Sequence, residues 1–319
     1  MSTHPRLTVG VATRNRPEAL ANCLRSLRLL DGLLAEAVVV DDGSDPPVEG
    51  PVAAGLAADL PPPVRFLRNE RSLSVAAARN QILRAARTPW VLDLDDDAFV
   101  VSREAVEAAM AVLEGDPAVA AVAFGQADAE GKPYPPSMQP AAVDYPCYVA
   151  TFVGYGHLLR RDAVLGVGGF RERLGIYGEE KELSLRLLDA GHRVVYLPGA
   201  DVGHVADAAG RDMRGYLHKT VRNSTLSALY NEPFPLVVAG AGVRLWRYFA
   251  MRRGWAVHDP GGFGQIVRGL ARELPQVLRE RRPVRRATWA AWRRMTQSAP
   301  EPYVPPAAAI AGRHAEGGG

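Results

Sequence analysis

The amino-acid sequence predicts an α/β protein with a mostly parallel sheet, and two observations support this fold class. Short apolar runs alternate through the first hundred residues with segments whose apolar residues recur at helical spacing, as is typical of βαβ units. Conspicuous polar residues follow the apolar runs, at the strand ends where such sheets gather their ligands. A chain of 319 residues suits one domain of roughly 200 to 250 residues with an appendage.

The beginning of the chain shows this alternation clearly. Residues 7–12 (LTVGVA) predict a strand. Residues 16–30 predict a helix, because Leu20 and Leu24 share one face and Pro17 falls in the first turn, where proline is favoured. The other elements expected before residue 100 are strands within 36–45, 64–69 and 90–97 and a helix over 75–87.

The rest of the chain has a different sequence pattern, with longer loops and more helical segments. Pro- and Gly-rich residues 45–63 and 131–140 predict surface connections, the first with one weak helix. A helix begins at the acidic pair Glu179 and Glu180, and a strand then leads to His204. From residue 211 the sequence is helical and basic. We therefore expect a main domain at 1–210, a basic helical extension at 211–297 and a disordered tail at 298–319.

Composition limits the classes of function. The net charge of +3 gives no support for nucleic-acid binding by the whole protein. Cys23 and Cys147 lack metal-knuckle spacing, which fits core positions in a reducing compartment. Neither a secretory signal nor a run of 18 apolar residues is evident, so the expected location is the cytoplasm.

An acidic cluster lies at the end of the fourth predicted strand, in PWVLDLDDDAFV. Asp93, Asp95, Asp96 and Asp97 repel one another unless a metal ion, an arginine-rich neighbourhood or solvent compensates them. In an extended chain Asp95 and Asp97 would point to one side and could share Mg²⁺ or Mn²⁺, with Asp96 facing away. A solvated acidic turn is the alternative.

Three other motifs have both a functional and a plain structural explanation. Asp41 and Asp42 could accept hydrogen bonds from a nucleoside, or could form an Asx-type turn. Glu179 and Glu180 could be catalytic, or could simply stabilise a helix N-terminus. His204 could be a ligand or a buried structural histidine.

The order of these motifs resembles that of the family 2 glycosyltransferases, from about Leu7 to His204. The segments that carry the resemblance are VGVATRNRPEALANCLRSL, AVVVDDGSD, RNERSLSVAAARN, VLDLDDDA, VGGF and YGEEKELSLRLLDAGHRVVYLPGADVGH. The resemblance implies a GT-A nucleotide-diphospho-sugar transferase fold, a Rossmann-like mixed sheet flanked by helices. Residues 1–210 would be its catalytic domain.

The resemblance also implies a donor site for a nucleoside-diphosphate sugar. Its nucleobase pocket would be lined by Thr13, Arg14, Asp41, Asp42 and Arg79. Asp95 would lie near the ribose and the metal, with Asp96 as its neighbour on the donor side. Asp97 would bind Mg²⁺ or Mn²⁺, and His204 would complete the metal or diphosphate site.

Glu180 falls where the family has its catalytic carboxylate and would be the general base. An inverting transfer needs one base to deprotonate the acceptor hydroxyl and a metal to neutralise the leaving diphosphate. The family often has aspartate at this position, so Glu179 is an alternative base. Ser74 also departs from the family, which commonly has glycine there, and GGFRE replaces GGFDE.

The sequence therefore predicts a metal-dependent inverting glycosyltransferase whose acceptor is a glycan, a lipid-linked or a small-molecule hydroxyl. The alternatives are a non-catalytic nucleotide-sugar-binding protein and a phosphotransferase of the haloacid-dehalogenase type. The basic region Arg279–Arg294, with Trp289 and Trp292, predicts either contact with a membrane surface or lipid-linked acceptor, or a solvent face on packing helices. The segment HKTVRNSTLSALYNEPFP, residues 218–235, loosely resembles the tail region of rhamnosyltransferase-like members of the family.

Overall fold

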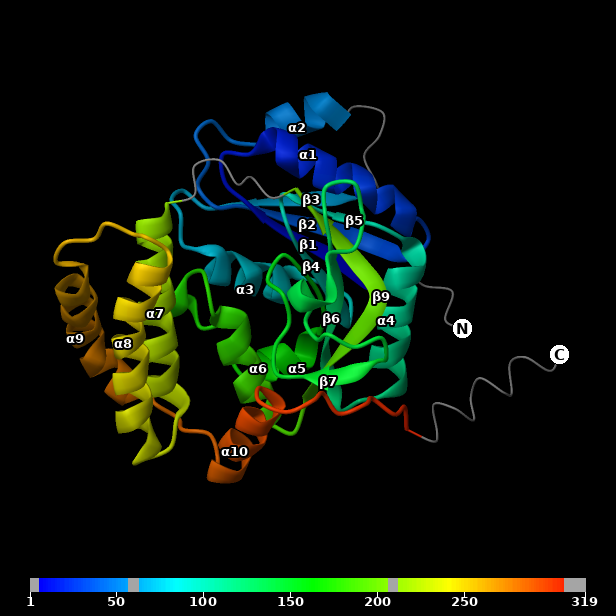
Figure 1. The fold of residues 1–319 in the computed structure, drawn as a ribbon. Helices are drawn as coiled ribbons and strands as arrows, with labels where there is room; N and C mark the ends of the chain where they lie inside the picture. Colours follow the sequence, from blue (N-terminus) through cyan, green and yellow to red (C-terminus); the bar gives the residue numbers. More distant parts are fainter. Residues whose placement is uncertain (1–5, 57–62, 206–211, 307–319) are drawn as a thin grey trace.

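The computed structural model describes residues 6–56, 63–205 and 212–306. Its centre is a curled sheet with the strand order β3-β2-β1-β4-β8-β6-β9-β5, and β7 pairs with β9 (Figure 1). The strands are β1 (Leu7–Thr13), β2 (Leu34–Asp41), β3 (Val64–Arg68), β4 (Trp90–Asp95), β5 (Ala98–Val100), β6 (Val119–Ala127), β7 (Cys147–Val149), β8 (Gly156–Arg160) and β9 (Arg193–His204).

The sheet is mixed. Strands β1 to β4 are mutually parallel, as the alternating pattern predicts. Strand β8 runs antiparallel to β4 and β6, whereas β6 and β9 are parallel. The short strands β5 and β7 both pair antiparallel with β9. The expectation of a mostly parallel sheet therefore holds for the first hundred residues and not beyond them.

Helices cover both faces of the sheet. One core joins α1 and α4 to the sheet face that carries Val9 and Val39, and the other packs α3, α5 and α6 against the face that carries Val38. Successive residues of β2 thus point into opposite cores, which explains the unbroken apolar run at residues 37–40. The helices of this domain are α1 (Pro17–Ser26), α2 (Glu49–Leu56), α3 (Val75–Ala85), α4 (Arg103–Gly115), α5 (Arg161–Gly166) and α6 (Glu179–Asp189), with short 3₁₀ turns at Leu27–Leu30, Pro136–Met138 and Glu172–Leu174. Cys23 and Cys147 are buried, as expected.

The C-terminal region is helical, as predicted, and has a core of its own. Its helices are α7 (Met213–Asn231), α8 (Leu236–Gly254), α9 (Gly262–Glu280) and α10 (Arg286–Met295). Leu217, Tyr230, Tyr248 and Leu270 belong to the core that α7, α8 and α9 share. The predicted boundary at residue 210 lies outside the described residues.

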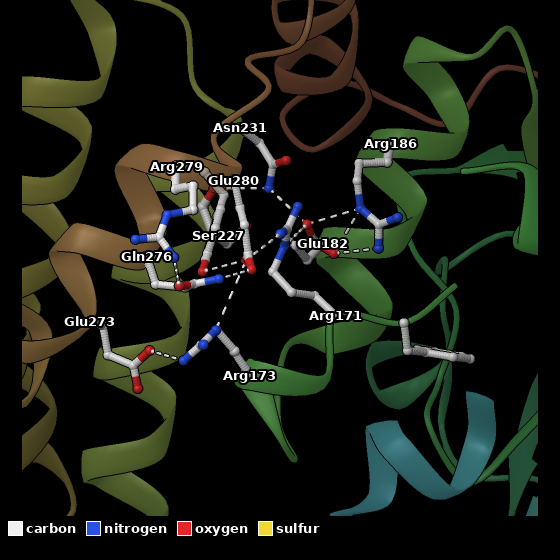
Figure 2. A network of polar contacts seen from close by, with 12 residues as sticks. Arg171, Arg173, Glu182, Arg186, Ser227, Asn231, Glu273, Gln276, Arg279 and Glu280 are labelled. Atoms are coloured by element: carbon white, nitrogen blue, oxygen red, sulfur yellow. Dashed lines mark hydrogen bonds and ion pairs between the residues drawn. The ribbon is translucent and has the colours of Figure 1, made fainter. Parts of the chain in front are cut away.

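A polar network joins this helical region to the main domain (Figure 2). Glu182 of α6 is fully buried and accepts hydrogen bonds from Arg171, Arg186 and Asn231 of α7. Burial alone would raise the pKa of Glu182, but the two arginines bring it below its ordinary value. The network fixes α7 against the helix that begins with Glu179 and Glu180.

The described part of the predicted tail is ordered against the sheet, which corrects the expectation of disorder for residues 298–306. The backbone amide of Tyr303 donates to Pro146, and that of Tyr148 on β7 donates to Glu301. The Tyr303 ring is 9% exposed and belongs to the main core. This segment thereby satisfies backbone groups at the edge of β7. Residues 307–319 lie outside the described residues.

Candidate functional site

The strand ends meet where the sequence predicts. Thr13 of β1 is in register with Asp41 of β2, and Ala12 is in register with Asp95 of β4. Strand β5 pairs Ala98 with His204 of β9, which brings the end of β9 to the same place. The N-terminus of α6, with Glu179 and Glu180, faces this edge through Arg79 of α3.

Arg79 is the centre of the site. Its guanidinium is 2% exposed and lies 3.0 Å from Asp95, 3.1 Å from Glu179, 3.3 Å from Glu180 and 3.5 Å from Asp93. It also donates to the carbonyl of Gly154, at 2.6 Å. Arginine therefore compensates this half of the acidic cluster. The placement differs from the expected role of Arg79 beside Asp41 and Asp42, because its partners are the carboxylates of β4 and α6.

One cation among four carboxylates leaves excess negative charge, and burial offsets it by favouring protonation. Burial raises the pKa of Asp93 to about 7, although Arg79 opposes the shift. The pKa of Asp95 is raised for the same reason. Burial and then the neighbouring Glu180 raise the pKa of Glu179 well above its ordinary value. Some of these acids thus hold protons near neutral pH.

Asp93 faces the protein interior and not the site. Its carboxylate lies 3.7 Å from Nε2 of His157, and neither of its oxygens has a hydrogen-bond partner in the described structure. Burial, together with Arg79, lowers the pKa of His157 well below its ordinary value, so the imidazole is neutral. Asp93 therefore lies against the Arg79 guanidinium on its interior side.

Glu179 and Glu180 differ in accessibility. The Glu179 side chain is 1% exposed, whereas that of Glu180 is 16% exposed. Glu180 closely approaches the backbone at Gly154, since a Cβ added there would lie 2.2 Å from its Oε1. Of the two acids, Glu180 is the one that a substrate can reach.

The chain turns at Asp96 and Asp97. These residues therefore do not continue the extended strand on which the expected alignment of Asp95 and Asp97 depends. Strand β4 ends at Asp95, and the next two residues form the turn into β5. Asp96 does not face away: it is buried, accepts from Thr13 at 2.7 Å and pairs with Arg16 at 3.0 Å. Burial raises its pKa to about 6 despite these two partners.

Asp97 pairs with His204 and with Arg16. Its Oδ1 lies 3.1 Å from Nε2 of His204, and its Oδ2 lies 2.8 Å from Arg16. Burial opposes ionisation, but His204 and Arg16 hold the pKa of Asp97 below its ordinary value. The ring of Tyr155 stacks on that of His204 with 4.3 Å between centroids, which fixes the imidazole.

The predicted metal ligands are brought together only in part. Asp97 and His204 form a carboxylate–imidazole pair, but Asp95 is turned to Arg79. Within residues 6–56, 63–205 and 212–306, no three His, Cys, Asp or Glu side chains converge as a metal cluster. The Asp97 carboxylate suits Mn²⁺ or Mg²⁺, whereas the His204 imidazole suits the transition metal Mn²⁺ better than Mg²⁺. Two protein ligands leave positions open for phosphate oxygens.

The hydrogen bonds of Asp41 and Asp42 are of the kind expected if these residues form turns, the structural alternative to nucleoside binding. Asp41 accepts from the amides of Ser44 and Val48 and pairs with Arg68 at 2.7 Å. Asp42 accepts four hydrogen bonds from residues 69–74. These bonds outweigh the burial of both side chains and lower the pKa of each. The two carboxylates therefore hold the loops that border the site.

The structure also identifies site residues that sequence reasoning missed. Arg16 bridges Asp96 and Asp97, whereas the predicted Arg14 is exposed and has no hydrogen bond or ion pair with the described residues. Arg14 and Arg16 both follow the first strand, in TRNRP, so this segment could have indicated Arg16 as well as Arg14. The pattern GYGH, residues 154–157, was another, because it contains Gly154 and Tyr155.

The basic region Arg279–Arg294 packs on the main domain to a large extent. The Trp292 ring is 8% exposed and lies in a small core with Leu185 of α6. The nitrogen of the Trp292 indole donates to Ala150, and Arg285 pairs with Asp189. These contacts favour the packing interpretation for the two tryptophans over a membrane face.

Comparisons with known proteins agree with this fold. A family profile described as "Glycosyl transferase family 2" matches residues 8–167. The pre-mycofactocin glycosyltransferase of Mycobacterium tuberculosis is 30% identical over 260 residues, which cover 76% of this chain and 52% of that protein. The chain thus spans about half the length of that relative. The N-acetylglucosaminyl-diphospho-decaprenol L-rhamnosyltransferase of M. tuberculosis is 46% identical over 61 residues, 19% of this chain and 20% of that protein.

Among solved structures, the mannosyltransferase PcManGT from Pyrobaculum calidifontis, in complex with GDP-Man and Mn²⁺, has a TM-score of 0.58 and 18% sequence identity. The match covers 92% of this chain and 85% of that one. The architecture described above is the GT-A fold, as the family resemblance implies. None of the helices in the described residues is long and apolar enough to cross a membrane.

Proposed function

The chain belongs to glycosyl transferase family 2, and from this premise we propose that it is a metal-dependent inverting enzyme. It would move a sugar from a nucleoside-diphosphate sugar to the hydroxyl of a glycan, lipid-linked or small-molecule acceptor. The observation that carries the proposal is the accessible Glu180 beside a buried Arg79 that binds three further carboxylates.

Glu180 is our proposed general base. Its exposed fraction of 16%, against 1% for Glu179, supports the choice. The raised pKa of Glu179 also supports it, because a carboxyl that keeps its proton cannot accept another. Arg79 would keep Glu180 oriented toward the acceptor, and an inverting transfer needs no covalent nucleophile.

Donor binding would use the opposite side of the site. Asp41 and Asp42 would shape and contact the nucleobase pocket, with Thr13, Asp96 and the exposed Arg14 along the path to the diphosphate. Asp97 and His204 would hold Mn²⁺ or Mg²⁺, with Asp95 nearby, and the bound ion would neutralise charge on the leaving diphosphate. The Mn²⁺ in the complex of PcManGT supports the choice of a divalent cation.

The donor can be identified by a thermal-shift screen of nucleoside diphosphates and their sugars, with and without Mn²⁺. A ligand at 100 times its dissociation constant adds roughly 2.7 kcal/mol of stability. Asp97→Ala should remove the Mn²⁺-dependent part of the shift. A shift that is identical with and without Mn²⁺ would contradict the metal site.

The base can then be tested with a matched pair of variants. Glu180→Gln should lower kcat by about 10²- to 10⁴-fold while donor binding is kept. Glu179→Gln should keep most of the activity, because the amide resembles the protonated acid at that position. Full turnover by Glu180→Gln would refute the assignment, and loss of turnover only in Glu179→Gln would transfer the role to Glu179.

A further inference from the structure

The outer face of α8 is unusually apolar for a surface helix. Trp246 is 73% exposed, Val238 67% and Val243 61%, and Phe234, just before the helix, is 71% exposed. The ring of Phe249 lies 5.2 Å from that of Trp246 and extends the same surface. We call Phe234, Val238, Val243, Trp246 and Phe249 the α8 face.

The opposite side of α8 is already packed. Val237 and Tyr248 are buried, and Tyr248 lies in the core shared with α7 and α9. Figure 1 shows these three helices together on the side of the molecule away from α4. A helix that is apolar on its outer as well as its inner side is normally covered on both. We therefore expect the α8 face to be covered by a binding partner.

Charge indicates what that contact is. Residues 212–306 contain sixteen Lys and Arg against six Asp and Glu, whereas the rest of the chain contains 22 against 29. Helix α8 has four arginines and no acid, and its Arg247 and Arg253 are exposed. All six acids of the region are engaged within the protein: Asp212, Glu232, Asp259, Glu273, Glu280 and Glu301. The helical region that carries the α8 face is thus strongly positive.

We propose that the α8 face docks on an anionic lipid bilayer, with Trp246 and its apolar neighbours at the level of the acyl boundary and Arg247 and Arg253 at the headgroup phosphates. Exposed aromatic and basic side chains on one helix suit this interface, because apolar burial and attraction to anionic lipid act together. A symmetric pair of chains fits less well, since it would bring the positive α8 surface against itself.

This surface differs from the Trp289 and Trp292 region that the sequence suggests, because Trp292 is buried. Burial, together with Arg244 and Arg247 of α8, lowers the pKa of Lys181, the residue that follows Glu180 on α6. The inference does not depend on the proposed reaction, and its test measures binding alone.

The experiment is flotation of the full chain with vesicles of phosphatidylcholine, with and without one third phosphatidylglycerol. The unmodified chain should float with the anionic vesicles and much less with the neutral ones. Val243→Ser combined with Trp246→Ser should weaken the association by about tenfold or more. Arg247→Gln with Arg253→Gln should weaken it on anionic vesicles only.

The matched control combines Met138→Ser with Val304→Ser, two residues that are 50% and 72% exposed elsewhere on the protein. This variant should float like the unmodified chain. The proposal is overturned if the unmodified chain does not float, or if the α8 variant floats as well as the control. It is also overturned if light scattering shows a dimer that the α8 substitutions dissociate, because a second copy would then cover the face.

Discussion

Replacing Arg79 by methionine removes the cation that lies among Asp93, Asp95, Glu179 and Glu180, while the apolar stem of the side chain is kept. Asp93 and Glu179 are each 1% exposed, so their carboxyl groups cannot turn to solvent. Removal of one partner from a buried ion pair costs about 3 to 5 kcal/mol, because the remaining charge is uncompensated. We expect a loss of this size for Arg79→Met at about pH 8.

The loss should depend on pH with a definite sign. The pKa of Asp93 is about 7 in the folded protein against 3.8 ordinarily, so the folded chain holds a proton that the unfolded chain has released. The contribution of this proton to stability is present at low pH and is lost as pH rises from 3.8 to about 7. Without Arg79 the carboxyls hold protons more tightly. The cost of Arg79→Met should therefore fall to roughly half or less near pH 5.

The assay is denaturant unfolding at both pH values, with Arg84→Met as the control. Arg84 lies on the same helix, but its pair with Glu172 at 3.4 Å is exposed, with side-chain exposures of 60% and 49%. Such pairs contribute about 0 to 1 kcal/mol, so the control should change stability little at either pH. The reasoning is refuted if Arg79→Met costs the same at both pH values, or no more than Arg84→Met.

Three further substitutions test the site and its support. Gly154→Ala places a methyl group 2.2 Å from Oε1 of Glu180; because that side chain can move, stability should change by less than about 1 kcal/mol while kcat falls roughly tenfold or more. Ser74→Gly should stabilise the protein by about 1 kcal/mol in a thermal melt, because Ser74 has φ of 120° and strain relief exceeds the loss of a weak cap. Glu182→Gln should cost about 3 kcal/mol in denaturant unfolding, because two arginines lose their charged partner. The pKa of Glu182 is lowered, so its contribution is present above the ordinary value of 4.5 and should fade as the medium becomes more acidic.

Each of these three predictions has a control variant or an outcome that would contradict it. Gly166→Ala, which adds a methyl group with nothing within 4 Å, should keep kcat, and an equal loss there would contradict the Gly154 argument. Destabilisation by Ser74→Gly would show that the cap outweighs the strain. A cost of Glu182→Gln that is unchanged in acid would show that charge is not what Glu182 supplies.

Strand order and strand ends follow from local pattern, which is why much of the site could be predicted. Residues that follow apolar strands in βαβ units must lie at one edge of the sheet, so Thr13, Asp41 and Asp95 are neighbours. The helical start at Glu179 is equally local, since acidic residues favour a first turn. Ser74 stands where the resembled family commonly has glycine, and its positive φ explains why glycine suits that position.

Partner choice among charged side chains does not follow from local pattern. Arg79 belongs to a helix whose burial against the sheet directs its guanidinium to Asp95 and Glu179, away from Asp41. Asp97 and His204 are 107 residues apart in the sequence, and they meet because β5 pairs with β9. No periodicity in the sequence reports the distance between such side chains, which depends on how the elements pack.

The sequence by itself determined the fold class, the order of the motifs and the chemistry available at the strand ends, because these depend on hydrophobic periodicity and residue type. Only the tertiary structure decided which carboxylate is accessible, which arginine neutralises which acid, and which aromatic side chains stay exposed. Trp292 and Trp246 both lie in basic helical sequence, yet Trp292 is 8% exposed and Trp246 73%. The physical reason is that burial and desolvation arise from neighbours distant in the chain, and these neighbours set both the charge state and the free surface.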